Sequence, residues 1–172
     1  MTPAPQDPAL APWRQLQERL AGFFAARSRD LLASEFDLTR RDGEEFGRLC
    51  VHGAGGAEFE AGDVRATVKR AGRSRYRMLA GQAEVLAEIT GSADTPEVRC
   101  GERLYEVKLG LLRNMAVARS SGGSEVARVA GRLTNRSYEG FFDAGNEGAL
   151  PLAVFLLYRI VLLRRRAFLA GQ

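Results

Sequence analysis

The densest group of side chains that could do chemistry is a run of cations in RATVKRAGRSRYR, residues 65–77. The run holds six positive charges and no acid. Guanidinium groups bind phosphate oxygens through paired hydrogen bonds, which makes arginine well suited to gripping anions. The sequence therefore predicts an anion-binding site formed by Arg65, Lys69, Arg70, Arg73, Arg75 and Arg77.

Two strands joined at Ala71-Gly72 would bring these cations together. Because side chains alternate along a strand, each strand places three residues on one face: Arg65, Thr67 and Lys69 on the first, and Arg73, Arg75 and Arg77 on the second. Like charges placed opposite each other destabilise a hairpin, and a bound anion would relieve that repulsion. A solvated, arginine-rich outer face explains the same residues, and the sequence leaves both interpretations open.

Arg159 is the one charge inside the longest apolar run of the chain, residues 149–163. A buried guanidinium needs an acceptor or a route to water. The simplest interpretation is that its stem lies along apolar surface while its head reaches the mouth of a barrel. A structural ion pair with Glu106 or Glu139 is a second interpretation, and ligand binding at the barrel end is a third.

Residue types give little support for catalytic or metal chemistry. His52 is the only histidine, and Cys50 lies two positions before it, on the same face of a strand. A thiolate–imidazole pair or a metal site needs a further orienting group or ligand, and none is marked nearby. The glycine-rich GAGG at 53–56 lacks the Lys-Ser/Thr of a phosphate loop. We expect a protein that is not an enzyme and that uses no metal or cofactor.

The loop DAGNEG, residues 143–148, offers three oxygen-bearing side chains, Asp143, Asn146 and Glu147. It is too short and too poor in carboxylates to resemble a dedicated calcium loop. We expect it to cap the helix that follows.

The apolar run 149–163 decides which elements position these residues. As a helix it would be about 22 Å long, which is too short for a bilayer core of about 30 Å. It is apolar on nearly every side, so protein must enclose it if lipid does not. Pro151 fits only in a first turn, which places the helix start near residues 148–150. The sequence predicts a central, enclosed helix.

The chain before this helix reads almost throughout as short strands separated by glycine-bearing breaks. We predict ten of them, the fifth of which also fits a short helix: 31–39, 45–51, 63–70, 74–80, 83–90, 97–100, 103–109, 114–120, 124–133 and 136–143. A barrel with more than eight strands has room for a helix inside. The predicted fold is mainly β (α+β): a closed antiparallel β-barrel of about 10–12 strands around the buried C-terminal helix, with an N-terminal amphipathic helix.

The opening hairpin FDLTRRDGEEFGRL and the closing GFFDAGNEGALPLAVFLLYRI resemble the tubby-like superfamily, and LURP-one-related proteins are the most similar members. The resemblance covers about residues 31–166 and implies a barrel of about twelve strands around the C-terminal helix. It also implies contact with lipid, because tubby domains bind phosphoinositides through basic side chains and phospholipid scramblases are associated with calcium and lipid. No ligand residue of either group matches a position of this chain.

The N-terminal region is expected to form an appendage to the barrel. Residues 1–12 contain four prolines and are predicted to be a disordered tail. Residues 13–29 carry Trp13, Leu16, Leu20, Phe23 and Phe24 at helical spacing, with arginines elsewhere on the wheel. This helix would close a barrel mouth or pack on its wall; alternatively it lies in a membrane interface, or binds a partner or a second copy through residues 13–24.

Composition limits the function further. The 172 residues carry a net charge of +4, and two cysteines without a paired motif suit a reducing cytoplasm. The first residues lack the charged and apolar regions of a secretory signal. Nucleic acid is not expected as a partner, because the charge is small and aromatic residues are sparse. Two hypotheses remain: a binding module for anionic phosphate groups or lipid headgroups at a membrane surface, and a structural or protein-interaction protein that uses the N-terminal helix.

Overall fold

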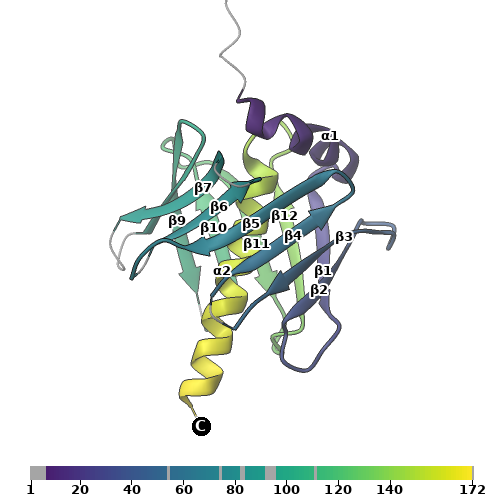
Figure 1. The fold of residues 1–172 in the computed structure, drawn as a ribbon, viewed down its shortest axis with the longest axis vertical. Helices are drawn as coiled ribbons and strands as arrows, with labels where there is room; N and C mark the ends of the chain where they lie inside the picture. Colours follow the sequence, from purple (N-terminus) through teal and green to yellow (C-terminus); the bar gives the residue numbers. More distant parts are fainter. Residues whose placement is uncertain are drawn as a thin grey trace, which may run out of the picture.

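The structure, a computed structural model, describes residues 7–53, 55–73, 75–81, 84–91, 96–110 and 112–171. Figure 1 shows a barrel of strands wrapped around one long helix, α2, with a short helix, α1, at the opposite end from the C-terminus. The predicted fold class is confirmed: the chain is mainly β, with a closed antiparallel barrel.

In the described residues the barrel has twelve strands, each hydrogen-bonded to its neighbours in sequence, and β1 closes the ring on β12. For example, Phe24 lies opposite Gly140 of β12, and Ala26 lies opposite Leu38 of β2. The strands are β1 (Phe23–Ser28), β2 (Glu35–Thr39), β3 (Glu45–Val51), β4 (Ala57–Ala61), β5 (Val64–Arg70), β6 (Tyr76–Ala80), β7 (Glu84–Gly91), β8 (Pro96–Cys100), β9 (Arg103–Gly110), β10 (Met115–Arg119), β11 (Glu125–Gly131) and β12 (Ser137–Phe142).

Helix α2 (Ala149–Ala170) fills the barrel. Its residues from Ala149 to Leu162 are buried on all sides except at Arg159, as a helix without a polar face requires. The helix begins where Pro151 predicts, but it ends seven residues beyond the predicted end at residue 163. No helix in the described part of the chain is both long enough and apolar enough to cross a membrane.

The N-terminal prediction is partly wrong. Of the tail predicted over 1–12, residues 1–6 lie outside the described residues, and Pro8–Leu10 forms a 3-10 turn that leads into α1 (Ala11–Leu20). The helix predicted over 13–29 ends at Leu20, because Ala21 and Gly22 adopt positive φ and turn the chain. Residues 23–28 then form strand β1 of the barrel instead of helix.

Helix α1 covers one mouth of the barrel with its apolar side. Trp13 is 1% exposed and stacks on Phe59 of β4, with ring centroids 5.0 Å apart. Leu16 and Leu20 are also buried. The helix therefore packs on the barrel and does not offer its large apolar side chains to a partner or a membrane.

Consecutive antiparallel strands place their turns alternately at the two ends of the barrel. The α1 end consists of residues 7–22 and the turns 40–44, 62–63, 101–102, 120–124 and 143–148. The opposite end, from which the last two turns of α2 project (Figure 1), is called the exit end here. It consists of the described residues of the turns 29–34, 52–56, 71–75, 111–114 and 132–136, together with residues 164–171.

Candidate functional site

The predicted basic hairpin exists as β5 and β6, in which Lys69 lies opposite Arg77. Burial alternates along both strands, so Arg65, Lys69 and Arg77 point outward while Val68, Met78 and Tyr76 point into the barrel. Arg73 and Arg75 belong to the turn between the strands and not to β6. The cations are thus divided between the outer wall and the exit end.

Ion pairs neutralise much of the charge on the wall. Arg65 lies 3.3 Å from a carboxylate oxygen of Glu60 on β4. Glu88 of β7 lies between Arg77 and Arg99, 2.9 and 3.1 Å from their guanidinium nitrogens. The hydrogen bond from Arg77 holds the pKa of Glu88 below its usual value although the side chain is buried, and Arg99 adds to that effect. This part of the predicted cluster is an ion-paired outer face.

The turn between β5 and β6 is tied together by one of the predicted cations. Arg70 donates hydrogen bonds to the carbonyl oxygens of Gly72 and Arg73, at 3.1 and 3.4 Å. Arg73 and Arg75 are exposed at this turn. They remain at the exit end, next to the strand that begins with Tyr76.

Tyr76 connects this hairpin to Arg159 of α2. The guanidinium carbon of Arg159 lies 4.2 Å from the centroid of the Tyr76 ring, within cation–π range. The Nε and Nη1 atoms of Arg159 are buried, and neither has a hydrogen-bond partner among the described residues. Among these residues Arg159 forms no ion pair with Glu106 or Glu139, so the interpretation with the head at the barrel mouth describes its position best.

Arg166 lies two helical turns further along α2, on the same side as Arg159. Burial alone would raise the pKa of the Tyr76 phenol. A hydrogen bond from Arg166, the charges of both arginines and a weaker hydrogen bond from Arg159 outweigh that effect and lower the pKa. A Cβ atom at Gly55 would lie 3.6 Å from Nη2 of Arg166, which places the turn between β3 and β4 beside the same guanidinium.

Tyr158 contacts both Gly55 and Tyr76. Its hydroxyl donates a hydrogen bond to the carbonyl oxygen of Gly55, and its ring lies edge-on to Tyr76 with centroids 5.9 Å apart. Burial raises the pKa of Tyr158 to about 12, so the phenol keeps its proton. Arg159, Arg166, Tyr76, Tyr158 and Gly55 are called the arginine–tyrosine cluster below. The cluster holds two guanidinium groups, and Nε and Nη1 of Arg159 lack acceptors among the described residues. It can therefore accommodate an anion.

The surroundings of Cys50 and His52 do not favour the catalytic or metal-binding roles considered for them. Cys50 and His52 both point outward, as the alternation predicts, and burial raises the pKa of the Cys50 thiol, which disfavours a nucleophilic thiolate. His52 lies 3.6 Å from Glu58. Within the described ranges, no three His, Cys, Asp or Glu side chains lie where they could hold a metal ion together.

The loop 143–148 is used to join α1 to α2. Asp143 accepts a hydrogen bond from the amide of Gly145 at 2.9 Å, Asn146 accepts one from that of Gly148 at 3.2 Å, and Glu147 forms an ion pair with Arg14. The side-chain cap of α2 comes from elsewhere: the side-chain oxygen of Gln17 accepts the amide of Leu150 at 3.1 Å. The predicted capping by this loop occurs through its backbone, because the carbonyl oxygen of Asn146 accepts the amide of Ala149 at 3.0 Å, but in the described structure no side chain of the loop caps the helix.

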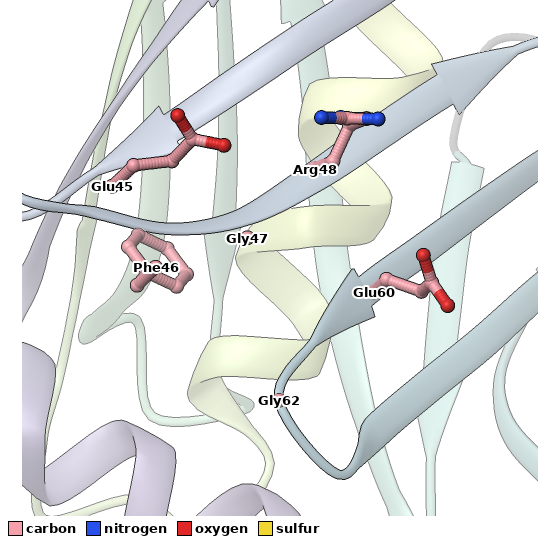
Figure 2. Close-up of a pocket in the computed structure, with 6 residues that line it drawn as sticks. All are labelled: Glu45, Phe46, Gly47, Arg48, Glu60 and Gly62. Atoms are coloured by element: carbon pink, nitrogen blue, oxygen red, sulfur yellow. The ribbon is translucent and has the colours of Figure 1, made fainter.

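The hollows outside the arginine–tyrosine cluster in the described part of the chain include two large ones. The first, of about 440 Å³, opens where β3 and β4 diverge beside Gly47. Figure 2 shows Glu45 and Arg48 on one side of β3 and Phe46 on the other. The second, of about 520 Å³, lies at the α1 end around Cys100, whose thiol has its pKa raised to about 12 by burial. No described side chain lining either hollow has a buried polar atom without a partner.

Comparisons with known proteins support the architecture. A crystal structure of a protein from Arabidopsis thaliana superposes with a TM-score of 0.57 over 81% of this chain and 90% of the other, at 15% sequence identity. This likeness shows a shared fold. No protein-family model matches the chain, and no curated protein matches it in sequence.

Four of the five members of the cluster were not among the predicted site residues: Gly55, Tyr76, Tyr158 and Arg166. Two of them, Tyr76 and Arg166, had a signal in the sequence. The alternation that turns Arg75 and Arg77 outward already sends Tyr76 inward. Arg166 follows Arg159 by seven positions, which is nearly two full turns of an α-helix. Both signals were present in the sequence, but the contact between β6 and α2 depends on how the barrel closes.

Proposed function

We propose that this protein is a non-enzymatic binding module that recognises anionic phosphate groups with the arginine–tyrosine cluster at the exit end. The observation that carries the proposal is Arg159, whose Nε and Nη1 are buried and lack acceptors among the described residues. Buried donors are nearly always hydrogen-bonded. Two buried donors without an acceptor at the barrel mouth therefore favour a bound ligand that supplies the acceptor.

The surrounding charges favour a phosphate over a neutral acceptor. Arg166 approaches the same tyrosine as Arg159, and Arg73 and Arg75 lie in the adjoining turn. Arginine binds phosphate oxygens in a bidentate manner, and cation–π contact with the face of an aromatic ring holds a guanidinium in place. The proposed ligand is a phosphate group, carried either by a lipid or by a free molecule.

The resemblance to the tubby-like superfamily adds support of a weaker kind. The twelve-stranded barrel around a C-terminal helix is the architecture that the resemblance implies. We propose membership of that superfamily on this basis, and a cytoplasmic location at a membrane surface. Because unrelated functions share folds, the phosphate proposal depends on the cluster and not on the resemblance.

The alternative function, a protein-interaction module built on the N-terminal helix, has lost its main support. It requires Trp13 and the following apolar residues at the surface, but Trp13, Leu16 and Leu20 are buried against the barrel. Phe24 is a buried barrel residue. The exit end is therefore the preferred site.

Binding of inorganic pyrophosphate, measured by isothermal titration calorimetry at low ionic strength, tests the proposal. The double variant Arg159→Gln/Arg166→Gln should lose at least about tenfold in affinity, since charge-assisted hydrogen bonds to phosphate disappear. Arg119→Gln is the matched control, because Arg119 is an exposed arginine of β10 near the opposite end. Equal affinity of the double variant and the control, or no binding by the natural chain, would contradict the proposal.

A further inference from the structure

Exposed apolar side chains gather at the exit end. Six of the eight large hydrophobic residues exposed in the described part of the chain belong to it: Leu31, Leu32, Leu112, Leu133, Phe168 and Leu169. Leu133 is 98% exposed and Leu31 is 84% exposed, so these side chains stand clear of the barrel. Single exposed leucines are ordinary, but a group of this size at one end marks an interaction surface.

Hydrogen bonds from the end of α2 hold most of these residues in one place. Arg164 donates to the carbonyl oxygen of Leu133 at 2.9 Å, and Arg165 donates to that of Ala33 at 2.7 Å. The turns 132–136 and 29–34 therefore lie against the projecting helix that carries Phe168 and Leu169. Leu31, Leu32, Leu133, Phe168 and Leu169 are called the apolar rim below.

The charge around the apolar rim is almost entirely positive. In the described residues of the exit end, nine arginines accompany a single carboxylate, Asp30: Arg29, Arg73, Arg75, Arg113, Arg132, Arg136, Arg164, Arg165 and Arg166. The carboxylate of Asp30 accepts hydrogen bonds from the side chain and amide of Ser34 within its own turn. The surface thus combines leucine and phenylalanine with nine arginines.

This combination of apolar and cationic side chains favours one kind of partner over others. Two copies docked through this end would bring like charges together, which disfavours a second chain as the occupant. An anionic bilayer offers both an apolar interior for the leucines and phosphate groups for the arginines. Segments that bind at a membrane interface typically combine apolar side chains with neighbouring cations.

We propose that the exit end docks on an anionic lipid bilayer, with the apolar rim inserted among the acyl chains and the arginines in the headgroup layer. The proposal rests on the proposed function, because it makes the phosphate at the arginine–tyrosine cluster that of a lipid. Burial of the rim adds an attraction that a soluble phosphate cannot provide.

Flotation with vesicles tests the docking surface. The natural chain should bind vesicles of phosphatidylcholine mixed with phosphatidylglycerol and should not bind phosphatidylcholine alone. Leu31→Ser/Leu32→Ser and Phe168→Ser/Leu169→Ser should each weaken binding by more than about tenfold, equivalent to about 1.4 kcal/mol. Leu104→Ser is the matched control, since Leu104 is 48% exposed on β9, beside a turn of the α1 end. These variants alter exposed side chains and should keep the affinity for pyrophosphate.

The outcomes separate the two proposals. If the natural chain binds pyrophosphate but ignores anionic vesicles, or if the rim variants bind vesicles as the natural chain does, the docking surface is wrong and the phosphate site stands. If it binds neither, both proposals fail. Equal binding to neutral vesicles would also overturn docking, and so would a dimer in sedimentation velocity that the rim variants convert to monomers.

Fluorescence gives the orientation. A tryptophan introduced by Leu133→Trp should be quenched by brominated acyl chains in anionic vesicles. The natural Trp13 is buried at the α1 end and should not be quenched in the unmodified chain. Absence of quenching at position 133 would contradict insertion of the rim.

Discussion

At the α1 end, the described residues carry eight carboxylates and four arginines, whereas at the exit end they carry one carboxylate and nine arginines. The α1 end also buries its aromatic residue, Trp13, while the exit end exposes leucines and phenylalanine. The same alternating turns build both ends, so strand topology does not cause the difference. One end is covered by its own helix, whereas the other exposes apolar and cationic side chains.

Hydrogen bonding also differs between the ends, because the buried Gln17 has partners at the α1 end, whereas buried nitrogens of Arg159 lack them among the residues that the structure describes. At the α1 end, Gln17 donates to the carbonyl oxygens of Ala144 and Asn146, at 3.0 and 2.7 Å, and accepts from Leu150. At the exit end, two nitrogens of the Arg159 side chain are buried without acceptors in the described chain. A complete network stabilises a fold, and an incomplete one leaves donors for a ligand.

The largest expected effect on stability is at the α1 end. Trp13→Ala removes a buried ring that stacks on Phe59, and should lower the free energy of unfolding by about 3–5 kcal/mol. Urea denaturation measures it. Leu133→Ala, at the exposed position of the exit end, should change stability by less than about 0.5 kcal/mol. Similar losses for the two variants would show that the ends do not differ as described.

Removal of the long-range helix cap should have an intermediate effect. Gln17→Ala leaves the amide of Leu150 without its acceptor, at a cost of about 2 kcal/mol. Gln15→Ala, an exposed change on the same helix, is the control. If both variants unfold at the same urea concentration as the natural chain, Gln17 does not cap α2.

Arg159→Leu should change stability in the opposite direction. The substitution removes buried N–H groups that lack acceptors but also loses the cation–π contact with Tyr76, and the balance favours the variant by about 1 kcal/mol. Thermal unfolding should show a raised midpoint without pyrophosphate and no further rise on its addition, whereas the natural chain is stabilised by the ligand. A residue with a purely structural role would instead lower the midpoint.

The smallest effect concerns the turn that carries Leu31 and Leu32. Burial alone would raise the pKa of Asp30, but hydrogen bonds from Ser34, Glu35 and Ser28 outweigh it and lower the pKa to about 2. A lowered pKa stabilises the fold above the ordinary value near 3.8, and this contribution is lost as the pH falls toward about 2. NMR titration of Asp30 measures the pKa directly, and Asp30→Asn should remove this part of the pH dependence. A midpoint near 4 would contradict the turn geometry.

Much of the fold can be predicted from local sequence patterns, but two of the twelve strands, β1 and β4, were not predicted. The apolar helix and ten strands carry strong periodicities. Strand β1 was missed because Phe23 and Phe24 continue the helical spacing that starts at Trp13, and only the turn at Ala21-Gly22 breaks it. Strand β4, Ala57–Ala61, alternates apolar and acidic residues but is short and lies between glycine-rich turns.

The candidate site was less accessible from sequence. The cations of residues 65–77 are visible as a run, but their neutralisation by Glu60 and Glu88 depends on neighbouring strands. The contact of Arg159 with Tyr76 joins positions far apart in the chain and is set by the rotation of α2 inside the barrel. Sequence spacing could mark Arg159 as unusual, but it could not supply the ring beneath it.

The central claim is that the exit end holds the anion site, and the side-chain Nε–H signal of Arg159 tests it most directly. In nitrogen–proton correlation spectra, addition of inorganic pyrophosphate should shift this signal and the amide of Gly55. The Nε–H signal of Arg119 and the amides of the turn 40–44 should stay in place. Shifts confined to the α1 end or to the ion-paired Arg77 and Arg99, with Arg159 unmoved, would contradict the account.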